Sequence, residues 1–188
     1  MLRTLRRQVT RTTIVLLVAV YAVITGVTHP SPAAAAPAHG DIPDSATYLT
    51  LTAPHYKVQY IEGWGRQTAG SAITFSDKDS FERVMLQATP RGSLAAFVRG
   101  PEMTGLRRAH ATKISSPRAV SLPGGRGWYL QYTIPSAADP VTGKVVSLLT
   151  DRYYLTGPHQ LAVLTLASPV GDDNVDAYRR IAHSFGWR

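Results

Sequence analysis

The chain has 188 residues, of which 44% are hydrophobic and 17% are charged, and it contains no cysteine. These values suit one globular domain with an appendage, and they exclude disulfides, thiolate catalysis and cysteine-ligated zinc. The formal charge is +8, but Arg3, Arg6, Arg7 and Arg11 supply four of those charges before the first acidic residue. The remaining cations are scattered apart from the pairs Arg107-Arg108 and Arg179-Arg180, so we expect no nucleic-acid partner, which would need a clustered basic stripe.

The first 38 residues have the layout of an export signal. The four arginines precede the apolar run Ile14–Val27, and a tract rich in alanine and proline follows it. This run of about fourteen residues is shorter than the roughly 20 that span a bilayer. The A-x-A sites that end at Ala36 or Ala38 lie far beyond Val27, so a retained membrane anchor is the alternative to a cleaved signal peptide. In both cases we expect the domain to lie outside the cytoplasmic membrane, either secreted or anchored.

A linker is predicted at residues 39–45, before a domain that spans residues 46–188. The segment from His29 to Ser45 contains prolines and alanines and little else that is apolar, a composition typical of extended linkers. Because cysteine is absent, the domain depends on its hydrophobic core, and roughly 145 residues are enough to build one. We expect this domain to be a monomer.

Alternation of apolar and polar residues predicts strands along most of the domain. The expected strands cover residues 47–54, 55–64, 71–76, 80–90, 111–123, 126–135, 143–157 and 159–168. Turns are expected at Asp77–Asp79, within the glycine-rich stretch Gly124–Gly127, and at Gly157-Pro158. Strands that follow one another through such short turns favour an antiparallel sheet.

Two helical regions complete the predicted domain. Residues 93–109 have apolar side chains at helical spacing, and Gly100-Pro101 is expected to divide them into two short helices. Residues 174–185 are predicted to form a terminal helix, with Val175, Tyr178, Ile181, Ala182 and Phe185 on one face. The order of four strands, a helical connection, four strands and a helix predicts an α+β fold, in which helices pack on a central antiparallel sheet.

The segment "GDDNVDAYRR" places acidic or amide side chains at the first, third and fifth positions of a calcium-loop pattern. The sixth and twelfth positions hold Ala177 and His183, where an EF-hand requires glycine and glutamate. We therefore interpret the segment as a helix start, in which Asp172 or Asp173 caps the first turn and Asp176 favours the helix dipole. We expect no metal and no cofactor.

A series of weak motifs covers the domain in a fixed order. They are Tyr56–Trp64, a strand ending in Asp77-Lys78, then Thr142-Gly143-Lys144, Arg152-Tyr153, and a closing helix that ends in Ser184-Phe185. In this order residues 46–188 resemble bacterial PsbP-like domains, although Glu62-Gly63 stands where a proline often precedes the tryptophan. The resemblance implies a central antiparallel sheet flanked by helices.

The same resemblance implies an accessory role. Members of this family act as extrinsic subunits or accessory factors of photosystem II in oxygenic phototrophs. Many bacterial relatives are exported proteins, and some are proposed to bind lipids or other hydrophobic molecules. A shared fold does not fix function, and the leader of this chain is that of a generic exported protein, so no photosystem role is implied.

Three functional hypotheses follow from the motifs. The chain has no G-x-S-x-G, H-E-x-x-H, P-loop or dinucleotide-binding motif, which favours a non-catalytic accessory or interaction domain with a protein partner.

The second hypothesis is a module that binds a small hydrophobic or amphipathic ligand. For this site the candidates are Trp64, Trp128, Arg152 and Tyr154, because aromatic rings line apolar pockets and an arginine holds an anionic group. For Arg152 and its neighbour Asp151, the structural alternative is that one side chain is solvated and the other pairs with a neighbouring strand. The third hypothesis is a hydrolase with a dispersed Ser-His-Asp site.

Overall fold

The computed structural model describes residues 41–188, so the expected signal or anchor at residues 1–38 lies outside the described residues. The strands are β1 (Tyr48–Thr52), β2 (Tyr56–Ile61), β3 (Gly65–Ala69), β4 (Ala72–Asp77), β5 (Ser80–Ala88), β6 (Arg118–Leu122), β7 (Gly125–Pro135), β8 (Ser147–Thr156), β9 (Gln160–Pro169) and β10 (Gly186–Trp187). The helical elements are α1 (Leu94–Phe97), the π-helical segment η1 (Val98–Glu102), α2 (Met103–Arg108) and α3 (Val175–Ser184). Within residues 41–188, none of these helices has the length and hydrophobicity needed to cross a bilayer.

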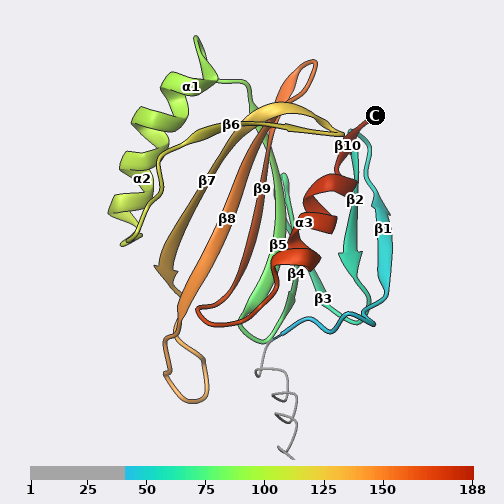
Figure 1. Cartoon of the computed structure of the whole chain (residues 1–188), viewed down its shortest axis with the longest axis vertical. Helices are drawn as coiled ribbons and strands as arrows, with labels where there is room; N and C mark the ends of the chain where they lie inside the picture. The colour runs from blue at the N-terminus through green and yellow to red at the C-terminus, as the bar shows by residue number, and fades with distance from the viewer. Residues whose placement is uncertain (1–40) are drawn as a thin grey trace, which may run out of the picture. The chain divides into compact units, whose positions relative to one another are not determined.

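The strands form two antiparallel sheets. Seven strands in the order β3-β4-β5-β9-β8-β7-β6 make the large sheet, and β1, β2 and β10 make a small one (Figure 1). Strand β9 lies at the centre of the large sheet, where its side chains alternate between two separate hydrophobic cores. Both faces of β9 are buried, which is why its sequence is almost continuously apolar. The predicted α+β class is confirmed.

One face of the large sheet, called here the α3 face, is covered by α3 together with the small sheet (Figure 1). Phe185, at the end of α3, is 1% exposed and stacks on Tyr56 of β2 with ring centroids 5.7 Å apart. The hydroxyl of Tyr178 donates a hydrogen bond to the carbonyl oxygen of Ala167 over 2.6 Å. The core also contains apolar side chains from β2, β4, β5 and β9: Val58, Phe75, Val84, Leu164 and Leu166.

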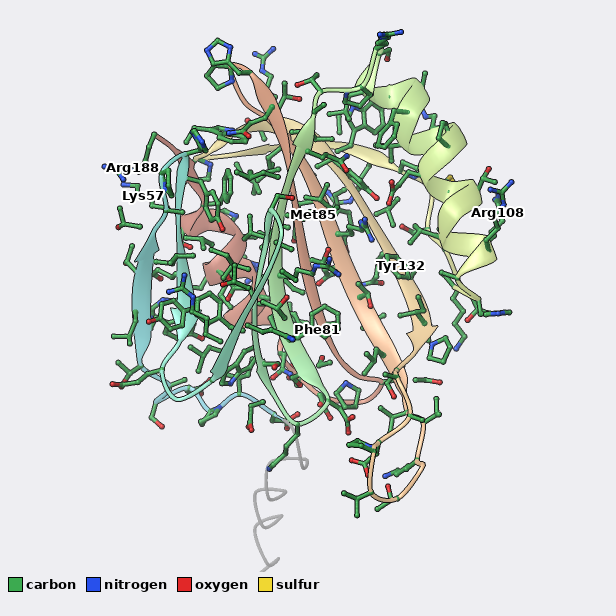
Figure 2. The ribbon with its side chains drawn as sticks, turned by 180° about the vertical axis from the view of Figure 1, so that it is seen from behind. Lys57, Phe81, Met85, Arg108, Tyr132 and Arg188 are labelled. Atoms are coloured by element: carbon green, nitrogen blue, oxygen red, sulfur yellow. The ribbon has the colours of Figure 1, made fainter. Side chains whose placement is uncertain are left out.

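The opposite face, called the α1–α2 face, is covered by the helical connection. Val98 of η1 and Leu106 of α2 are buried against the sheet. Their partners are side chains of β7, β8 and β9: Leu130, Tyr132, Tyr154, Leu161 and Val163. Figure 2 shows this side of the molecule, with Tyr132 on its strand and Arg108 at the end of α2.

The two predicted short helices correspond to α1 and α2, but the prediction that Gly100-Pro101 breaks the helical chain between them is wrong. The chain continues from α1 to α2 through the π-helical turn η1, which contains Pro101. In this turn the N–H of Met103 donates to the carbonyl oxygen of Val98, five residues earlier. A proline lacks an N–H and its ring crowds the carbonyl four residues before it. The wider turn accommodates both effects without ending the helix.

The terminal helix lies where it was predicted, except that Val175, which was predicted on the same face as Phe185, is exposed, and its first turn is capped differently. The N-cap residue is Asn174, and its side chain makes no capping hydrogen bond to the helix. Instead its Oδ1 accepts a hydrogen bond from the N–H of Ile42 over 2.7 Å. The expectation that Asp172 or Asp173 caps α3 is therefore wrong. Tertiary contact with the segment before β1 has replaced a local cap.

That segment, residues 41–45, falls in the predicted linker and contacts the domain. Besides the Ile42–Asn174 bond, Asp41 Oδ1 accepts a hydrogen bond from the N–H of Asp173 over 2.8 Å. Ile42 also packs against the core of the α3 face. The last residues of the chain are held as well, because the N–H of Arg188 donates to the carbonyl oxygen of His55.

The three predicted turns correspond to the hairpins β4–β5, β6–β7 and β8–β9, but the middle turn lies at Pro123-Gly124, because Gly125–Gly127 belong to β7. Strands β3 and β10 were not predicted. Strand β3 has the sequence "GRQTA" and is exposed throughout, so it carries no alternation of apolar and polar residues. Strand β10 has only two residues.

Candidate functional site

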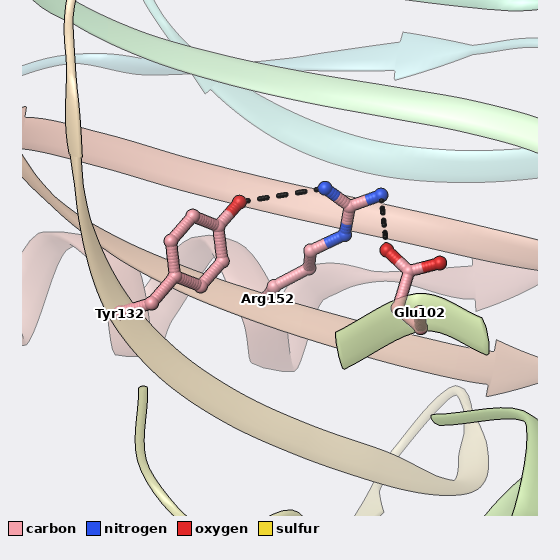
Figure 3. A network of polar contacts seen from close by, with 3 residues as sticks. All are labelled: Glu102, Tyr132 and Arg152. Atoms are coloured by element: carbon pink, nitrogen blue, oxygen red, sulfur yellow. Dashed lines mark hydrogen bonds and ion pairs between the residues drawn. The ribbon is translucent and has the colours of Figure 1, made fainter. Parts of the chain in front are cut away.

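A buried ion pair joins the helical connection to the large sheet. Nη2 of Arg152, on β8, lies 2.9 Å from Oε1 of Glu102 in η1. Nη1 of Arg152 donates to the hydroxyl of Tyr132 on β7 over 3.4 Å (Figure 3). The side chains of Arg152 and Glu102 are only 19% and 16% exposed. The pair therefore lies beneath η1, between the helical connection and the sheet.

The electrostatic surroundings keep Arg152 charged. Burial by itself lowers the pKa of Arg152, but the groups around it, chiefly Tyr154 and Tyr132, raise that pKa above its ordinary value. Burial also raises the pKa of Tyr154 far above the range of a free tyrosine. Glu102 is thus the counter-ion of Arg152 in this structure, and an external anion would have to displace it.

The neighbouring Asp151 points to the other face of the sheet. Its Oδ1 accepts hydrogen bonds from the Tyr129 hydroxyl over 2.6 Å and from the Gln131 side-chain amide over 3.0 Å. Both donors lie on β7, the strand next to β8. Asp151 and Arg152 therefore each have an intramolecular partner, Asp151 on a neighbouring strand and Arg152 on η1.

An apolar groove lies beside Trp128 at the end of the large sheet. Its volume is about 490 Å³. It is lined by residues of α1, β6, β7 and β8, namely Leu94, Ala119, Val120, Ser121, Arg126, Gly127, Trp128 and Thr156. The guanidinium carbon of Arg99 lies 4.6 Å from the centre of a Trp128 ring, within the distance of a cation–π interaction. The groove thus combines an apolar floor with cationic sides.

The stretch of chain that includes the α1 and β6 residues of this groove is rich in cations. Residues 91–126 contain seven lysines and arginines, all exposed: Arg91, Arg99, Arg107, Arg108, Lys113, Arg118 and Arg126. The same stretch contains one acidic residue, Glu102, which is paired with Arg152. Arg107 and Arg108 are adjacent, and the other five cations are spread along the stretch. We call it the basic segment.

Trp64 lies elsewhere, beside the segment that precedes β1. It packs against the core of the α3 face and lines a pocket of about 340 Å³ with Ile61. The rim of this pocket carries charged residues of both signs: Asp41, Asp77, Lys78, Asp79 and Lys144. Among residues 41–188, no three histidine or acidic side chains are arranged to hold a metal ion.

One ionisable side chain is enclosed in the core of the α3 face. Glu82 of β5 is 0% exposed, and neither of its carboxyl oxygens has a hydrogen-bond partner. Burial raises its pKa well above the ordinary value. The nearby Tyr56 hydroxyl also has no hydrogen-bond partner, and burial together with Glu82 raises its pKa to about 12. Burial therefore favours the protonated form of Glu82 in the folded protein.

The structure brings together three of the four candidate ligand-binding residues. Tyr154 and Trp128 belong to the core of the α1–α2 face, and Arg152 lies beside Tyr154. Trp64 belongs to the other core. Sequence reasoning missed Glu102 and Arg99. A count of charges in windows would have singled out the stretch that contains both, because one acidic residue among seven cations marks residues 91–126.

Comparison with known proteins identifies the fold. The solution structure of cyanobacterial PsbP (CyanoP) from Synechocystis aligns with 84% of this chain and 100% of its own length, at 16% identity and a TM-score of 0.53. The chain therefore has a PsbP-like fold, which confirms the resemblance of the sequence motifs at the level of the fold. No family model matches the sequence, and no curated protein matches it.

Two further solved structures are similar to smaller degrees. The Ran-binding protein Mog1p of Saccharomyces cerevisiae aligns with 74% of this chain and 94% of its own length, at 11% identity and a TM-score of 0.47. A protein from Bacteroides thetaiotaomicron aligns with 71% of this chain at 12% identity and a TM-score of 0.46. This chain spans 45% of the length of the Bacteroides protein.

Proposed function

We propose, from the PsbP-like fold and the charge distribution, that residues 46–188 form a non-catalytic interaction domain. The domain is exported and acts at the outer face of the cytoplasmic membrane, where it binds a protein partner. The observation that carries the proposal is the basic segment, with seven exposed cations and one internally paired acid. A surface of one sign attracts a partner of the opposite sign and accelerates their association.

The buried polar groups support a structural rather than a catalytic reading. Arg152 and Glu102 neutralise one another beneath η1. Glu82 is enclosed among apolar side chains, and its raised pKa has burial as its cause. A group with a perturbed pKa suggests catalysis when it lies in a cleft, whereas Glu82 is 0% exposed.

In-cell photo-crosslinking tests the interaction. A photoreactive amino acid at Thr104, exposed on α2, reports what contacts the basic segment, and one at Val141, which is 90% exposed in a loop, serves as the control position. We expect a protein adduct of defined mass from position 104 that disappears when Arg107 and Arg108 are changed to glutamate. An adduct that forms equally from both positions, or that survives the charge reversal, would contradict the proposal.

The location is supported by the export-signal pattern of the sequence and has its own test. The full chain with a C-terminal tag is expressed in its host, and intact spheroplasts are treated with an external protease. We expect the tag to be degraded in spheroplasts while a cytoplasmic marker survives. Protection of the tag until the membrane is lysed would overturn the exported location.

The groove beside Trp128 favours a second candidate function, the binding of a small hydrophobic or amphipathic molecule. Its volume of about 490 Å³ lies within the range of small-molecule sites. Native mass spectrometry of protein isolated from its host distinguishes the two functions. A co-purifying small molecule that is lost on Trp128→Ala would favour this candidate over a protein partner.

A further inference from the structure

The outer edge of β6 is open. The strand lies at one end of the large sheet and pairs only with β7 among the described residues. Three of its five residues are exposed and the other two are half-buried. An edge strand presents unpaired backbone N–H and C=O groups, to which an extended chain can add as a further strand.

Arginines flank this edge on both faces of the sheet. On the α3 face, the guanidinium carbon of Arg118 lies 4.3 Å from the centre of the Tyr129 ring. On the α1–α2 face, Arg126 lines the groove and Arg99 lies over Trp128. Side chains of a strand alternate between the two faces of a sheet. An added strand would therefore direct its side chains toward arginine on either face, and toward the apolar groove on one of them.

From this arrangement we infer that β6 is the docking site for an extended, acidic segment of a partner protein, which joins the large sheet as an eighth strand. An apolar side chain of the segment enters the groove beside Trp128, and its carboxylates pair with Arg99, Arg118 and Arg126. This inference rests on the proposed interaction function and specifies the surface and the chemistry of the partner.

The surface suits a protein segment better than a lipid bilayer. The exposed large hydrophobic side chains of the described residues are Leu49, Val141, Val145, Leu149, Val170 and Val175, and all of them lie outside the basic segment. A membrane-binding surface combines cations with apolar side chains that insert between lipids. Here the apolar surface is recessed in the groove, where a single side chain can enter it.

A synthetic peptide of about six residues, the usual length of a strand, with a single valine among glutamates, is the probe, because it presents carboxylates to both faces of the sheet and one apolar side chain to the groove. Its binding to the full chain, purified in a non-ionic detergent, is measured by fluorescence anisotropy. Two matched peptides separate charge from backbone pairing. One has lysine in place of glutamate, and the other keeps the glutamates but is N-methylated along the backbone. We expect the acidic peptide to bind, the lysine peptide not to bind, and the N-methylated peptide to bind at least about tenfold more weakly, since it cannot form the ladder.

Protein variants localise the binding. Arg99→Glu with Arg126→Glu should weaken binding of the acidic peptide by at least about tenfold, which corresponds to 1.4 kcal/mol. The control makes the same change of charge at Lys57 and Lys144, which are exposed and lie outside the basic segment, and it should leave binding within about twofold once salt screening is matched. Unchanged melting curves establish that each variant is folded. Hydrogen exchange should show new protection of the backbone amides of residues 118–122 when the peptide is bound.

Three outcomes would overturn the inference. One is equal binding of the N-methylated peptide, and another is binding that survives reversal of Arg99 and Arg126. The third is tight binding to phosphatidylglycerol vesicles with none to the acidic peptide, which would identify a lipid surface. If the acidic peptide does not bind but the crosslinked adduct from position 104 still depends on Arg107 and Arg108, the proposed interaction function is retained and only the docking site at β6 is rejected.

Discussion

The elements on the two faces of the large sheet are held by different kinds of contact. On the α3 face, a ten-residue helix and a small sheet pack through large apolar side chains, and Phe185 stacks on Tyr56 and meets Trp187 edge-on. On the α1–α2 face, two helices of four and six residues are joined by a π-turn. Beneath that turn they are held by the ion pair between Glu102 and Arg152.

One face of the sheet therefore supplies most of the buried apolar area, and the elements on the other face carry exposed positive charge. The α3 face gains its stability from buried apolar area, which is roughly proportional to the surface removed from water. The helical connection buries Val98 and Leu106 and directs its arginines outward. Only a few side chains of the connection pack against the sheet. Its arginines can therefore all remain in solvent, outside the core. We expect substitutions on the two faces to differ in size and in pH dependence.

The largest effect is expected from Phe185→Ala. Phe185 is 1% exposed and contacts rings on β2 and β10, so its truncation leaves a cavity and should lower the free energy of unfolding by about 3–5 kcal/mol. Urea denaturation followed by far-UV circular dichroism measures the loss. Val175→Ala, on the same helix at a position 59% exposed, should change stability by less than about 0.5 kcal/mol. Similar losses for both variants would contradict the apolar anchoring of α3.

A smaller loss is expected when the ion pair beneath η1 is broken. Glu102→Gln leaves Arg152 as a half-buried charge without a counter-ion, and should cost about 1–3 kcal/mol. The double variant Glu102→Leu with Arg152→Met should recover most of that loss, because an apolar pair avoids the desolvation of two charges. The exposed pair Arg179–Asp176 serves as the reference, and Arg179→Ala should cost at most about 0.5 kcal/mol. A double variant less stable than Glu102→Gln would show that the pair itself stabilises the connection.

Glu82 is expected to give the α3 face a pH dependence. Burial raises its folded pKa, so the folded protein keeps a proton that the unfolded chain releases as the pH rises above the ordinary value of about 4.5. The contribution of Glu82 to stability is therefore greatest below that pH. It falls by up to about 1.4 kcal/mol per pH unit until the folded pKa is reached. Glu82→Gln cannot titrate, so its urea midpoint, compared with that of the wild type from pH 4 to pH 9, should lack this fall. Parallel pH curves for the two proteins would show that Glu82 is ionised in the fold.

The sequence predicts elements better than contacts between elements. The long strands β8 and β9 and the face of α3 that carries Ile181 and Phe185 follow from periodicity, because burial on one or both faces imposes a repeat on the residues. The pair Glu102–Arg152 has no such signal. Its members are fifty positions apart in the chain, and each alone is typical of an exposed residue.

Predictions from local sequence rules also failed where tertiary contacts determined the structure. Pro101 breaks a standard helical turn, yet the packing of Val98 and Leu106 on the sheet keeps the chain helical through a π-turn. The acidic residues before α3 match a capping pattern, but the N-cap residue is Asn174, and its Oδ1 accepts a hydrogen bond from the N–H of Ile42 rather than from the helix. Strand β3 depends on pairing with β4 rather than on side-chain burial. In each case the deciding partner is distant in sequence.

The smallest expected effect concerns the acidic residues before α3, and it has the sign opposite to that of a helix cap. Burial raises the pKa of Asp172, as do the carboxylates of Asp41 and Asp79, so its ionised form is disfavoured in the folded state. Asp172→Asn should therefore raise the free energy of unfolding at pH 7, by less than about 1 kcal/mol because the site is only partly shielded from solvent. This gain should vanish below about pH 4, where the carboxyl is protonated in both states. Asp173→Asn, at an exposed position, is the control and should be close to neutral. Urea titrations at pH 4 and pH 7, each repeated with calcium, make the measurement. A loss of about 0.5–2 kcal/mol on Asp172→Asn would restore the capping role, and a calcium-dependent gain in the wild type that disappears in the variant would instead identify a cation site.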